Sequence, residues 1–269
     1  NGVLFLLFLF CCTDYSLAQT VDVVTGLSGN PTRLLANGSD LYFTQNGGGN
    51  LLVIDISDDM PIPVEVTGGL LEPASMVLNG NNLYIANYGS NSISKIDIAS
   101  SNPVLTDVIT GVTRPNGMLL LGNDLYFSES TAGRISRIDI SESSPTVDTI
   151  ATGLNFPVCL ALSGNDLYVS EALGDKISKI DLSEPAPAAV DVITGLERPI
   201  GLRIVGDTLY FTQFIGNKIS KLDISGSAPT AVDVVAGLEG PSDLIFVGEE
   251  LYIAENLGQK ISKLGMVIT

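Results

Sequence analysis

The chain of 269 residues contains no histidine, no tryptophan and only three cysteines. The lack of histidine excludes a serine–histidine triad and any zinc site with imidazole ligands. Glycine-rich phosphate loops, paired-cysteine zinc motifs and the Gly-x-Ser-x-Gly elbow are also missing. Any catalysis would therefore depend on carboxylates, amides or a hard metal ion such as calcium held by oxygen ligands.

Positive charge is scarce as well. The sequence has 13 Lys and Arg against 30 Asp and Glu, a formal net charge of −17. A surface of this sign repels nucleic acid and anionic membranes. We therefore expect no nucleic-acid partner, and we read the acidity mainly as a source of solubility.

Only one long apolar run is present, "VLFLLFLFCC" at residues 3–12, followed by "SLA" at residues 16–18. This pattern is typical of a signal peptide with a small-x-small cleavage site, and the run is too short to span a membrane. We predict cleavage after Ala18, a single mature domain over residues 19–269, and a secreted, extracellular or periplasmic location. Cleavage would leave Cys159 as the only cysteine, expected as a small buried residue, so no intramolecular disulfide can form.

The rest of the sequence repeats with a period of 42 residues. Six prolines keep this step, at Pro31, Pro73, Pro115, Pro157, Pro199 and Pro241. Six tyrosines keep the same step, at Tyr42, Tyr84, Tyr126, Tyr168, Tyr210 and Tyr252. Such regular self-similarity predicts six structural units with no insertions between their anchor points.

Each unit contains four short β-rich runs separated by Gly, Asn, Asp, Ser or Pro, and no stretch shows a helical apolar period. Four strands in a unit of roughly 40 residues indicate one blade of a β-propeller. The sequence therefore predicts an all-β, six-bladed β-propeller with four antiparallel strands per blade. The first run of each unit is nearly all apolar, which suits the innermost strand of a blade.

The first and last segments complete each other. The motif "VDVVTGL" at residues 21–27 matches the fourth run of a unit, "VDVITGL" at residues 190–196, but no first three runs precede it. The last unit supplies three runs and then ends. We predict that residues 21–25 form the fourth strand of the last blade, so that no sheet edge is left open where the ring closes.

Nine of the 13 basic residues lie in or next to the third run of a unit. The other four are arginines. They lie near the repeating prolines, at Arg33, Arg114, Arg198 and Arg203. The loop into an innermost strand lies where a propeller channel opens, so we expect these guanidinium groups to converge on one mouth and to bind a carboxylate, sulfate or phosphate. The alternative is structural ion pairing, with Arg33 bound to Asp243 of the neighbouring unit.

Arg203 is the least regular of the four. The equivalent position in every other unit is Leu, Val, Ala or Ile. A charge in an apolar strand must find a partner or water, because its desolvation alone is costly. We therefore expect Arg203 to line a wet channel or to reach a carboxylate.

A ring of polar residues follows each repeating tyrosine by three positions. Its members are Gln45, Asn87, Glu129, Glu171, Gln213 and Glu255. One hypothesis is a belt of hydrogen bonds that ties blade to blade through backbone groups. The other hypothesis is that Glu129, Glu171 and their equivalents face a ligand.

The segment "PNGMLLLGNDLYFSESTAGRISRIDI" at residues 115–140 resembles the NHL repeat and is similar to blades of the gluconolactonase and regucalcin superfamily of six-bladed propellers. That resemblance implies a divalent metal, such as Ca²⁺, at the channel mouth, held by a glutamate, an asparagine and an aspartate. Asn116 in "PNG" looks like the asparagine and Glu239 in "EGP" like the glutamate. Asp243 lies one position from the slot expected for the aspartate.

The sequence supports two hypotheses of function. The first is a monomeric binding or scaffold module without a cofactor. It would take an anionic small molecule, a saccharide or a protein at a channel mouth formed by Arg33, Arg114, Asn116, Arg198, Arg203, Glu129, Glu171 and Asp243. The alternative is a metal-dependent lactonase or related hydrolase that uses Asn116, Glu239 and Asp243.

Overall fold

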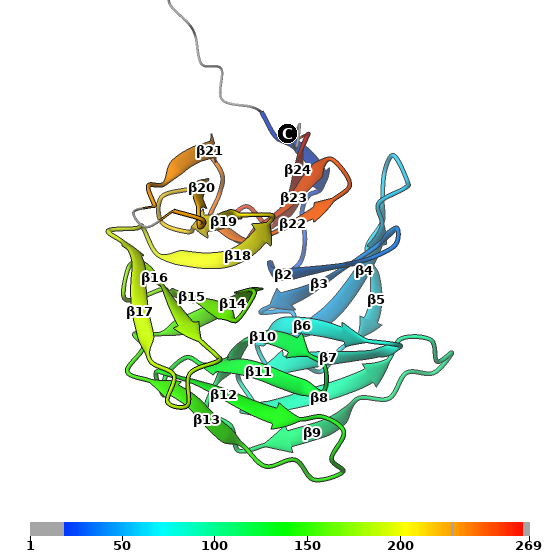
Figure 1. Cartoon of the computed structure of the whole chain (residues 1–269). Helices are drawn as coiled ribbons and strands as arrows, with labels where there is room; N and C mark the ends of the chain where they lie inside the picture. Colours follow the sequence, from blue (N-terminus) through cyan, green and yellow to red (C-terminus); the bar gives the residue numbers. More distant parts are fainter. Residues whose placement is uncertain (1–18, 227–228, 266–269) are drawn as a thin grey trace, which may run out of the picture.

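The computed structural model describes residues 19–226 and 229–265, so the predicted leader lies outside the described residues. Twenty-four strands form six four-stranded antiparallel sheets arranged around a central axis (Figure 1). No helix within these ranges is suited to crossing a membrane. The predicted six-bladed β-propeller is confirmed, and each sheet is one blade.

The blades follow one another along the chain, from the innermost to the outermost strand. Blade 1 contains β2 (Asn30–Asn37), β3 (Asp40–Asn46), β4 (Asn50–Asp55) and β5 (Val64–Thr67). Blade 2 contains β6 (Pro73–Asn79), β7 (Asn82–Asn87), β8 (Ser92–Asp97) and β9 (Thr106–Thr110). Blade 3 contains β10 (Pro115–Leu121), β11 (Asp124–Glu129), β12 (Arg134–Asp139) and β13 (Asp148–Thr152).

The other half of the ring has the same organisation. Blade 4 contains β14 (Pro157–Ser163), β15 (Asp166–Glu171), β16 (Lys176–Asp181) and β17 (Ala189–Thr194). Blade 5 contains β18 (Pro199–Val205), β19 (Thr208–Gln213), β20 (Lys218–Asp223) and β21 (Val232–Ala236). Blade 6 contains β22 (Pro241–Val247), β23 (Glu250–Glu255), β24 (Lys260–Gly265) and β1 (Val21–Val24).

The N-terminal strand closes the ring as predicted. β1 pairs antiparallel with β24, with Val21 opposite Lys263 and Val24 opposite Ile261. The backbone amide of Leu27 then donates a hydrogen bond to the carbonyl of Gln259 at 3.1 Å. Both ends of the described chain therefore share the sheet of blade 6.

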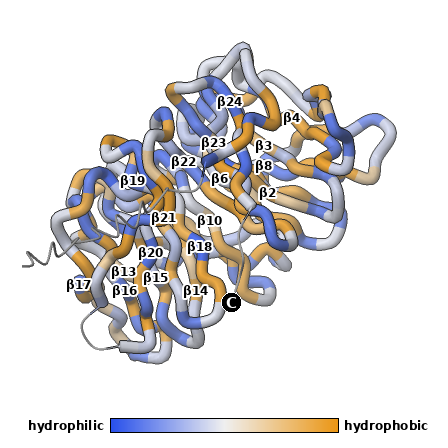
Figure 2. Tube along the Cα trace, turned by 90° about the horizontal axis from the view of Figure 1, so that it is seen from above, coloured by the Kyte–Doolittle hydropathy of each residue, from blue (hydrophilic) through white to orange (hydrophobic). Residues whose placement is uncertain are grey.

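The hydrophobic core lies between adjacent blades and not in one central mass. One cluster joins Tyr126 and Ile135 of blade 3 to Leu160, Leu167 and Val169 of blade 4, and equivalent clusters join other neighbours. Figure 2 shows that hydrophobic segments recur in every sheet. Because full burial of one such side chain contributes about 1.5–3 kcal/mol, each blade is stabilised mainly by its two neighbours. The axis of the ring is left free for a channel.

Candidate functional site in the central channel

The six innermost strands surround a cavity of about 480 Å³, a volume within the usual range of small-molecule sites. Its lining comes from the third to the sixth residue of these strands, counted from the repeating prolines, and consists mostly of Leu, Val, Ile, Ala and Met. We call the end of the ring that carries the prolines the proline face. The few polar side chains in the lining decide what the cavity can bind.

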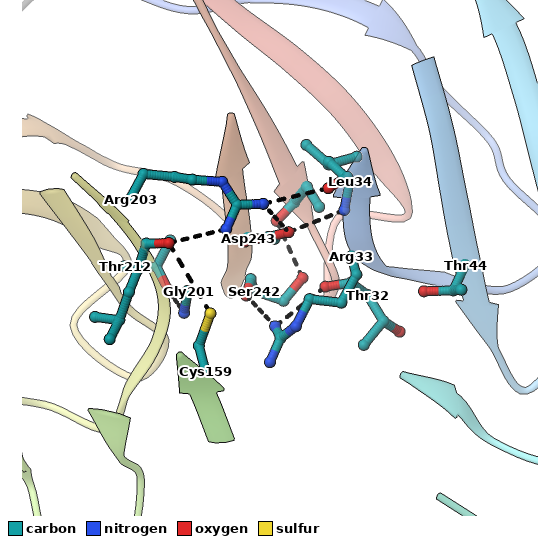
Figure 3. A network of polar contacts seen from close by, with 12 residues as sticks. Thr32, Arg33, Leu34, Thr44, Cys159, Gly201, Arg203, Thr212, Ser242 and Asp243 are labelled. Atoms are coloured by element: carbon teal, nitrogen blue, oxygen red, sulfur yellow. Dashed lines mark hydrogen bonds and ion pairs between the residues drawn. The ribbon is translucent and has the colours of Figure 1, made fainter. Parts of the chain in front are cut away.

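Arg33 crosses the channel at its proline end. The side chain is buried, and its Nη1 donates a hydrogen bond to the carbonyl oxygen of Ser242 at 2.7 Å (Figure 3). Its Nη2 donates to Oδ1 of Asn116 at 3.4 Å, so Arg33 links blade 1 to blades 6 and 3. The Nε atom has no hydrogen-bond partner among the described residues.

Arg203 and Asp243 form the only ion pair in the lining of this cavity as the structure describes it. Nη2 of Arg203 lies 3.4 Å from Oδ2 of Asp243 (Figure 3) and donates to the carbonyl of Leu34 at 3.3 Å. Nη1 of the same guanidinium donates a hydrogen bond to the carbonyl of Leu202 at 2.9 Å. Arg203 therefore lines the channel and also reaches a carboxylate, the two environments that the sequence predicted for it.

Asp243 is fully buried, and its two carboxylate oxygens differ. Oδ2 accepts a hydrogen bond from the backbone amide of Leu34 at 2.9 Å, and Oδ1 has no partner in the described part of the chain. The expected ion pair between Asp243 and Arg33 is not formed, because Oδ2 is directed to the Leu34 amide and to Arg203. The cavity thus contains two guanidinium groups and one carboxylate, an excess of one positive charge within a protein of net charge −17.

Arg114 and Arg198 do not line the cavity. The guanidinium of Arg114 lies over the ring of Tyr88, 4.7 Å from its centroid, and 3.7 Å from the carboxylate of Glu72. The guanidinium of Arg198 lies over the ring of Phe214 at 5.3 Å. Both arginines have positive φ, +48° and +58°, in the loop before a proline, and this backbone conformation accompanies stacking on a nearby aromatic ring. Two of the four predicted arginines thus line the cavity.

Glu129 does not line the cavity either. Its buried carboxylate accepts hydrogen bonds from the Thr113 amide at 2.6 Å, from the Ser136 hydroxyl at 2.6 Å and from two nitrogens of Arg134 at 2.7 and 2.8 Å. Burial alone would raise the pKa of Glu129, but the hydrogen bonds from Arg134, Ser136 and Thr113 outweigh it and lower that pKa.

The same contact recurs around the ring, always between a residue and the backbone amide sixteen positions before it. The pairs are Thr113 with Glu129, Asn155 with Glu171, Glu197 with Gln213, and Glu239 with Glu255. In blade 1 Nε2 of the Gln45 side chain donates instead to the carbonyl of Gly29, also sixteen positions earlier. Asn87 is one methylene shorter and bonds Ser94 of its own blade. This arrangement favours the belt hypothesis, since each contact ties a blade to the connection that precedes it.

The three residues of the metal hypothesis are each engaged with a basic side chain. Asn116 accepts a hydrogen bond from Arg33, and Asp243 is paired with Arg203. Glu239 is 60% exposed and lies 3.6 Å from Nζ of Lys260. No group of three His, Cys, Asp or Glu side chains suited to a metal occurs in residues 19–226 and 229–265. A divalent cation would have to displace guanidinium groups, so these residues do not fit the metal site that the resemblance implied.

Two further residues of the lining were not predicted from the sequence. Ser75 and Cys159 occupy the slot two residues after the proline, the same slot as Arg33 and Asp243. No side-chain hydrogen bond of Ser75 is found within the described ranges. The Cys159 thiol lies 3.9 Å from the carbonyl of Leu202, which also accepts a bond from Arg203. Reading this slot across all six units would have identified both residues as candidates.

Known proteins resemble this chain in structure but not in sequence. No protein-family profile matches the sequence, and no curated protein matches it. One similar structure is virginiamycin B lyase from Staphylococcus aureus, solved with quinupristin as a catalytically inactive histidine-to-alanine variant. It superposes with a TM-score of 0.67 at 17% identity, covering 93% of this chain and 99% of that one. A candidate gluconolactonase has a TM-score of 0.75 at 15% identity, covering 93% and 92%.

A third similar structure is an auxiliary nutrient binding protein from Bacteroides thetaiotaomicron, with a TM-score of 0.73 at 17% identity, covering 88% of this chain and 69% of that one. At these identities the likeness shows a shared fold. The class that fold and site define is therefore a six-bladed β-propeller with a charged cluster inside an apolar channel. The sequence resemblance to six-bladed propellers is confirmed at the level of fold.

Proposed function

We propose that this protein is a binding module whose channel holds a small organic anion with an apolar body. The observation that carries the proposal is the excess of Arg33 and Arg203 over Asp243 in a cavity whose other lining is aliphatic apart from the uncharged Ser75 and Cys159. The side chain of Arg203 is 30% exposed, so an incoming carboxylate can accept a charge-assisted hydrogen bond from it. Contact between the apolar wall and the rest of the ligand removes apolar surface from water, which favours binding.

The distribution of polar groups narrows the ligand class. The charged side chains come from blades 1, 5 and 6. Blades 2, 3 and 4 contribute mostly apolar side chains such as Met118 and Leu160, with Ser75 and Cys159 as their polar groups. A sugar would leave hydroxyl groups without partners against this wall, which is unfavourable. The asymmetry therefore favours an aliphatic or aromatic carboxylate over a saccharide.

The structural neighbours have different functions, and binding is the one that the composition of this chain supports best. The lyase neighbour is inactive as a histidine-to-alanine variant, and this chain has no histidine at all. Metal-dependent hydrolysis is the alternative, but its donors Asn116 and Asp243 are bonded to arginines and Glu239 lies beside Lys260. A nutrient binding protein is the neighbour whose described role agrees with the proposal.

Cys159 offers a direct test because it is the only cysteine in residues 19–269 and it lines the cavity beside Arg203. The alkylation rate of Cys159 is measured by mass spectrometry with iodoacetate, which is anionic, and with iodoacetamide, which is neutral. Local attraction of the carboxylate should raise the iodoacetate-to-iodoacetamide rate ratio by about tenfold over that of a free thiol in solution. The neutral reagent corrects for the intrinsic reactivity of the thiol.

The matched variants are Arg203→Met, which should bring the ratio down to that of the free thiol, and Ser75→Ala, which lines the same cavity and should leave the ratio unchanged. Equal ratios in the wild type and Arg203→Met would contradict anion binding in the channel, as would failure of either reagent to reach Cys159.

A second measurement compares ligands directly. Calorimetric titration with 3-phenylpropionate and octanoate should give binding, whereas their amides, which match them in shape but carry no charge, should give none. Arg203→Met should weaken carboxylate binding by about tenfold or more, because the charge-assisted hydrogen bond is lost. Equal affinity for acid and amide would refute the proposed role of the arginines.

The export of the protein is part of the same proposal. We infer from the leader at residues 1–18 that the mature chain begins at Gln19 and acts outside the cytoplasm as a monomer. Mass spectrometry of the product released by cells that express the full sequence should find Gln19 at the N-terminus. Sedimentation of that product should give a single species near the mass of one chain.

A further inference from the structure

Three large aliphatic side chains project into solvent from turns on the proline face of the ring, and a fourth, Leu71 at 59% exposed, lies on this face in the connection before Pro73. Leu173, Ile215 and Leu257 are 57%, 63% and 64% exposed. Each occupies the same position in the turn between the second and third strands of its blade, and the three blades, 4, 5 and 6, are consecutive. We call these three residues the apolar arc.

The exposure is built into ordered turns. The amide of Ile215 donates to the carbonyl of Glu197 at 3.3 Å, and the amide of Leu257 donates to the carbonyl of Glu239 at 3.1 Å. The carbonyl of Leu173 accepts a hydrogen bond from the side chain of Asn155 at 2.9 Å. The backbone of each turn is thereby held to the connection before its blade, and the aliphatic side chain is presented outward.

The turn itself does not require an aliphatic residue. In blades 1, 2 and 3 the equivalent positions are Gly47, Gly89 and Thr131. All six turns nevertheless connect strands of the same register. At this turn position the aliphatic residues are therefore confined to blades 4, 5 and 6, and local folding does not account for them.

Acidic side chains accompany the apolar arc. Glu197 and Glu239 supply the carbonyls that hold two of its turns, and their side chains are 53% and 60% exposed. The lysines that approach these carboxylates, Lys218 and Lys260, are only 23% and 20% exposed. Arg198 adds a cation beside Glu197, where it lies over the ring of Phe214, and Asp175 adds an exposed carboxylate beside Leu173. The outward charge beside the arc is thus predominantly negative. A second copy of this chain would bring like charges together, whereas a cationic partner is complementary.

We propose that the apolar arc is a docking surface for a cationic polypeptide segment that carries aliphatic or aromatic side chains. Leu173, Ile215 and Leu257 contact the apolar side chains of the segment, and Glu197 and Glu239 face its basic groups. This surface is separate from the channel, since no residue of the arc lines the cavity. The interaction therefore stands or falls independently of ligand binding in the channel.

The probe is a short synthetic peptide of alternating Lys and Leu, compared with a Lys/Ser peptide of equal charge and a Glu/Leu peptide of equal apolarity. Binding to the mature protein is measured by surface plasmon resonance at low and at physiological salt. We expect the Lys/Leu peptide to bind about tenfold more tightly than the Lys/Ser peptide, and the Glu/Leu peptide to show no binding. Equal affinity for the two basic peptides would overturn the proposal, because it would reduce the effect to non-specific charge.

The test variant replaces Leu173, Ile215 and Leu257 by Ser, and the single change Ile215→Ser serves as a milder version. The matched control replaces Val64, Val190 and Val232 by Ser, because these valines are 60%, 60% and 58% exposed on the outermost strands. The arc variant should lose about tenfold in affinity for the Lys/Leu peptide, and the control should lose none. Unchanged binding in the arc variant, or a concentration-dependent dimer that only this variant abolishes, would overturn the proposal.

Discussion

The belt of polar residues and the lining of the channel are both built from the 42-residue repeat, but they use it in opposite ways. The belt keeps one polar residue at the same position in all six blades, and five of them contact the connection sixteen positions earlier. The channel has charged lining residues in only three blades, at Arg33, Arg203 and Asp243. Where the repeat is kept, the contact serves the fold. Where it is broken, the residues create a site.

This difference separates stability from binding. Four belt residues accept a hydrogen bond from a backbone amide in the preceding connection, so the loss of one should weaken the fold and leave the channel unchanged. A charged channel residue sits where other units have Leu, Val, Ile, Ala, Ser, Gly or Cys, so the fold does not need it.

The largest effect is expected in the belt, from Glu171→Ala. This change removes the buried carboxylate that accepts hydrogen bonds from the Asn155 amide and the Ser178 hydroxyl. The hydroxyl keeps a second acceptor, Oδ1 of Asp191 at 3.2 Å, whereas the amide is left without one. We expect a loss of about 3 kcal/mol in the free energy of unfolding, measured by urea denaturation, because a buried donor without a partner is costly and a cavity is added.

The control for this belt variant is Asn87→Ala at the equivalent position. The Asn87 side chain donates one hydrogen bond, to Ser94, so its removal should cost about 1 kcal/mol. Carboxylate binding in the channel should be the same in both variants. Equal destabilisation by the two changes would show that the amide contacts of the belt are not what holds the blades.

The next largest effect is expected in the channel, from Asp243→Asn. The change removes the only carboxylate that the structure describes in the cavity lining and keeps the shape of the side chain. Unfolding free energy should fall by about 2 kcal/mol, since the bonds to Arg203 and Leu34 lose their charged acceptor. Affinity for a carboxylate ligand should rise by about tenfold, because the excess positive charge increases. Ser75→Ala should change neither quantity by more than about 0.5 kcal/mol.

A double variant tests whether the fold needs the charged pair in the channel. Arg203→Leu with Asp243→Ser gives both positions residue types that other units have there. Replacement of a buried ion pair by fitting neutral residues is often close to neutral, so the double variant should recover most of the stability that Asp243→Asn loses. It should bind a carboxylate about tenfold or more weakly than the wild type, because the charge-assisted hydrogen bond from Arg203 is lost. A double variant less stable than Asp243→Asn would mean that the ring depends on the channel charges.

The smallest effect at neutral pH is expected from Glu129→Gln. Glutamine occupies two belt positions naturally, at Gln45 and Gln213, so the loss should be below about 1 kcal/mol. The pKa of Glu129 lies below its ordinary value of 4.5 in the folded protein. Its contribution to stability is therefore fully present above about pH 4.5 and is lost as the pH falls through the folded pKa.

The variant and the wild type should accordingly converge in stability as the solution is acidified. Urea denaturation at a series of pH values from neutral to acid measures this. A difference between the two proteins that is independent of pH would contradict the assignment of a lowered pKa to Glu129.

The ring could be predicted from the sequence because it depends on spacing. The repeating prolines and tyrosines define six units, and the unmatched run at residues 21–27 implies the pairing of β1 with β24. The belt was one of two hypotheses for the polar residues after the tyrosines. Choosing between them needed the hydrogen bond from the Thr113 amide to Glu129 and its equivalents, which no spacing reveals.

The channel could be predicted only in part, because side-chain direction depends on local backbone conformation. Arg114 and Arg198 share the loop before a proline, and in each the positive φ accompanies stacking on an aromatic ring. The partner of Asp243 was assigned to Arg33 because the two share a slot in adjacent blades. The direction of the two guanidinium groups decides the pairing instead: Arg203 is directed to Asp243, and Arg33 to the carbonyl of Ser242. The sequence pattern does not give these directions.

The closing sheet of blade 6 has a consequence for how the gene could be rearranged. The natural break in the ring lies between a third and a fourth strand, β24 and β1, and each of the other blades contains an equivalent junction. If the present ends were linked and the chain were reopened between β12 and β13, blade 3 would take over the role of blade 6. Since surface loops tolerate new ends, such circular permutants should fold into the same ring, which has no intrinsic starting blade.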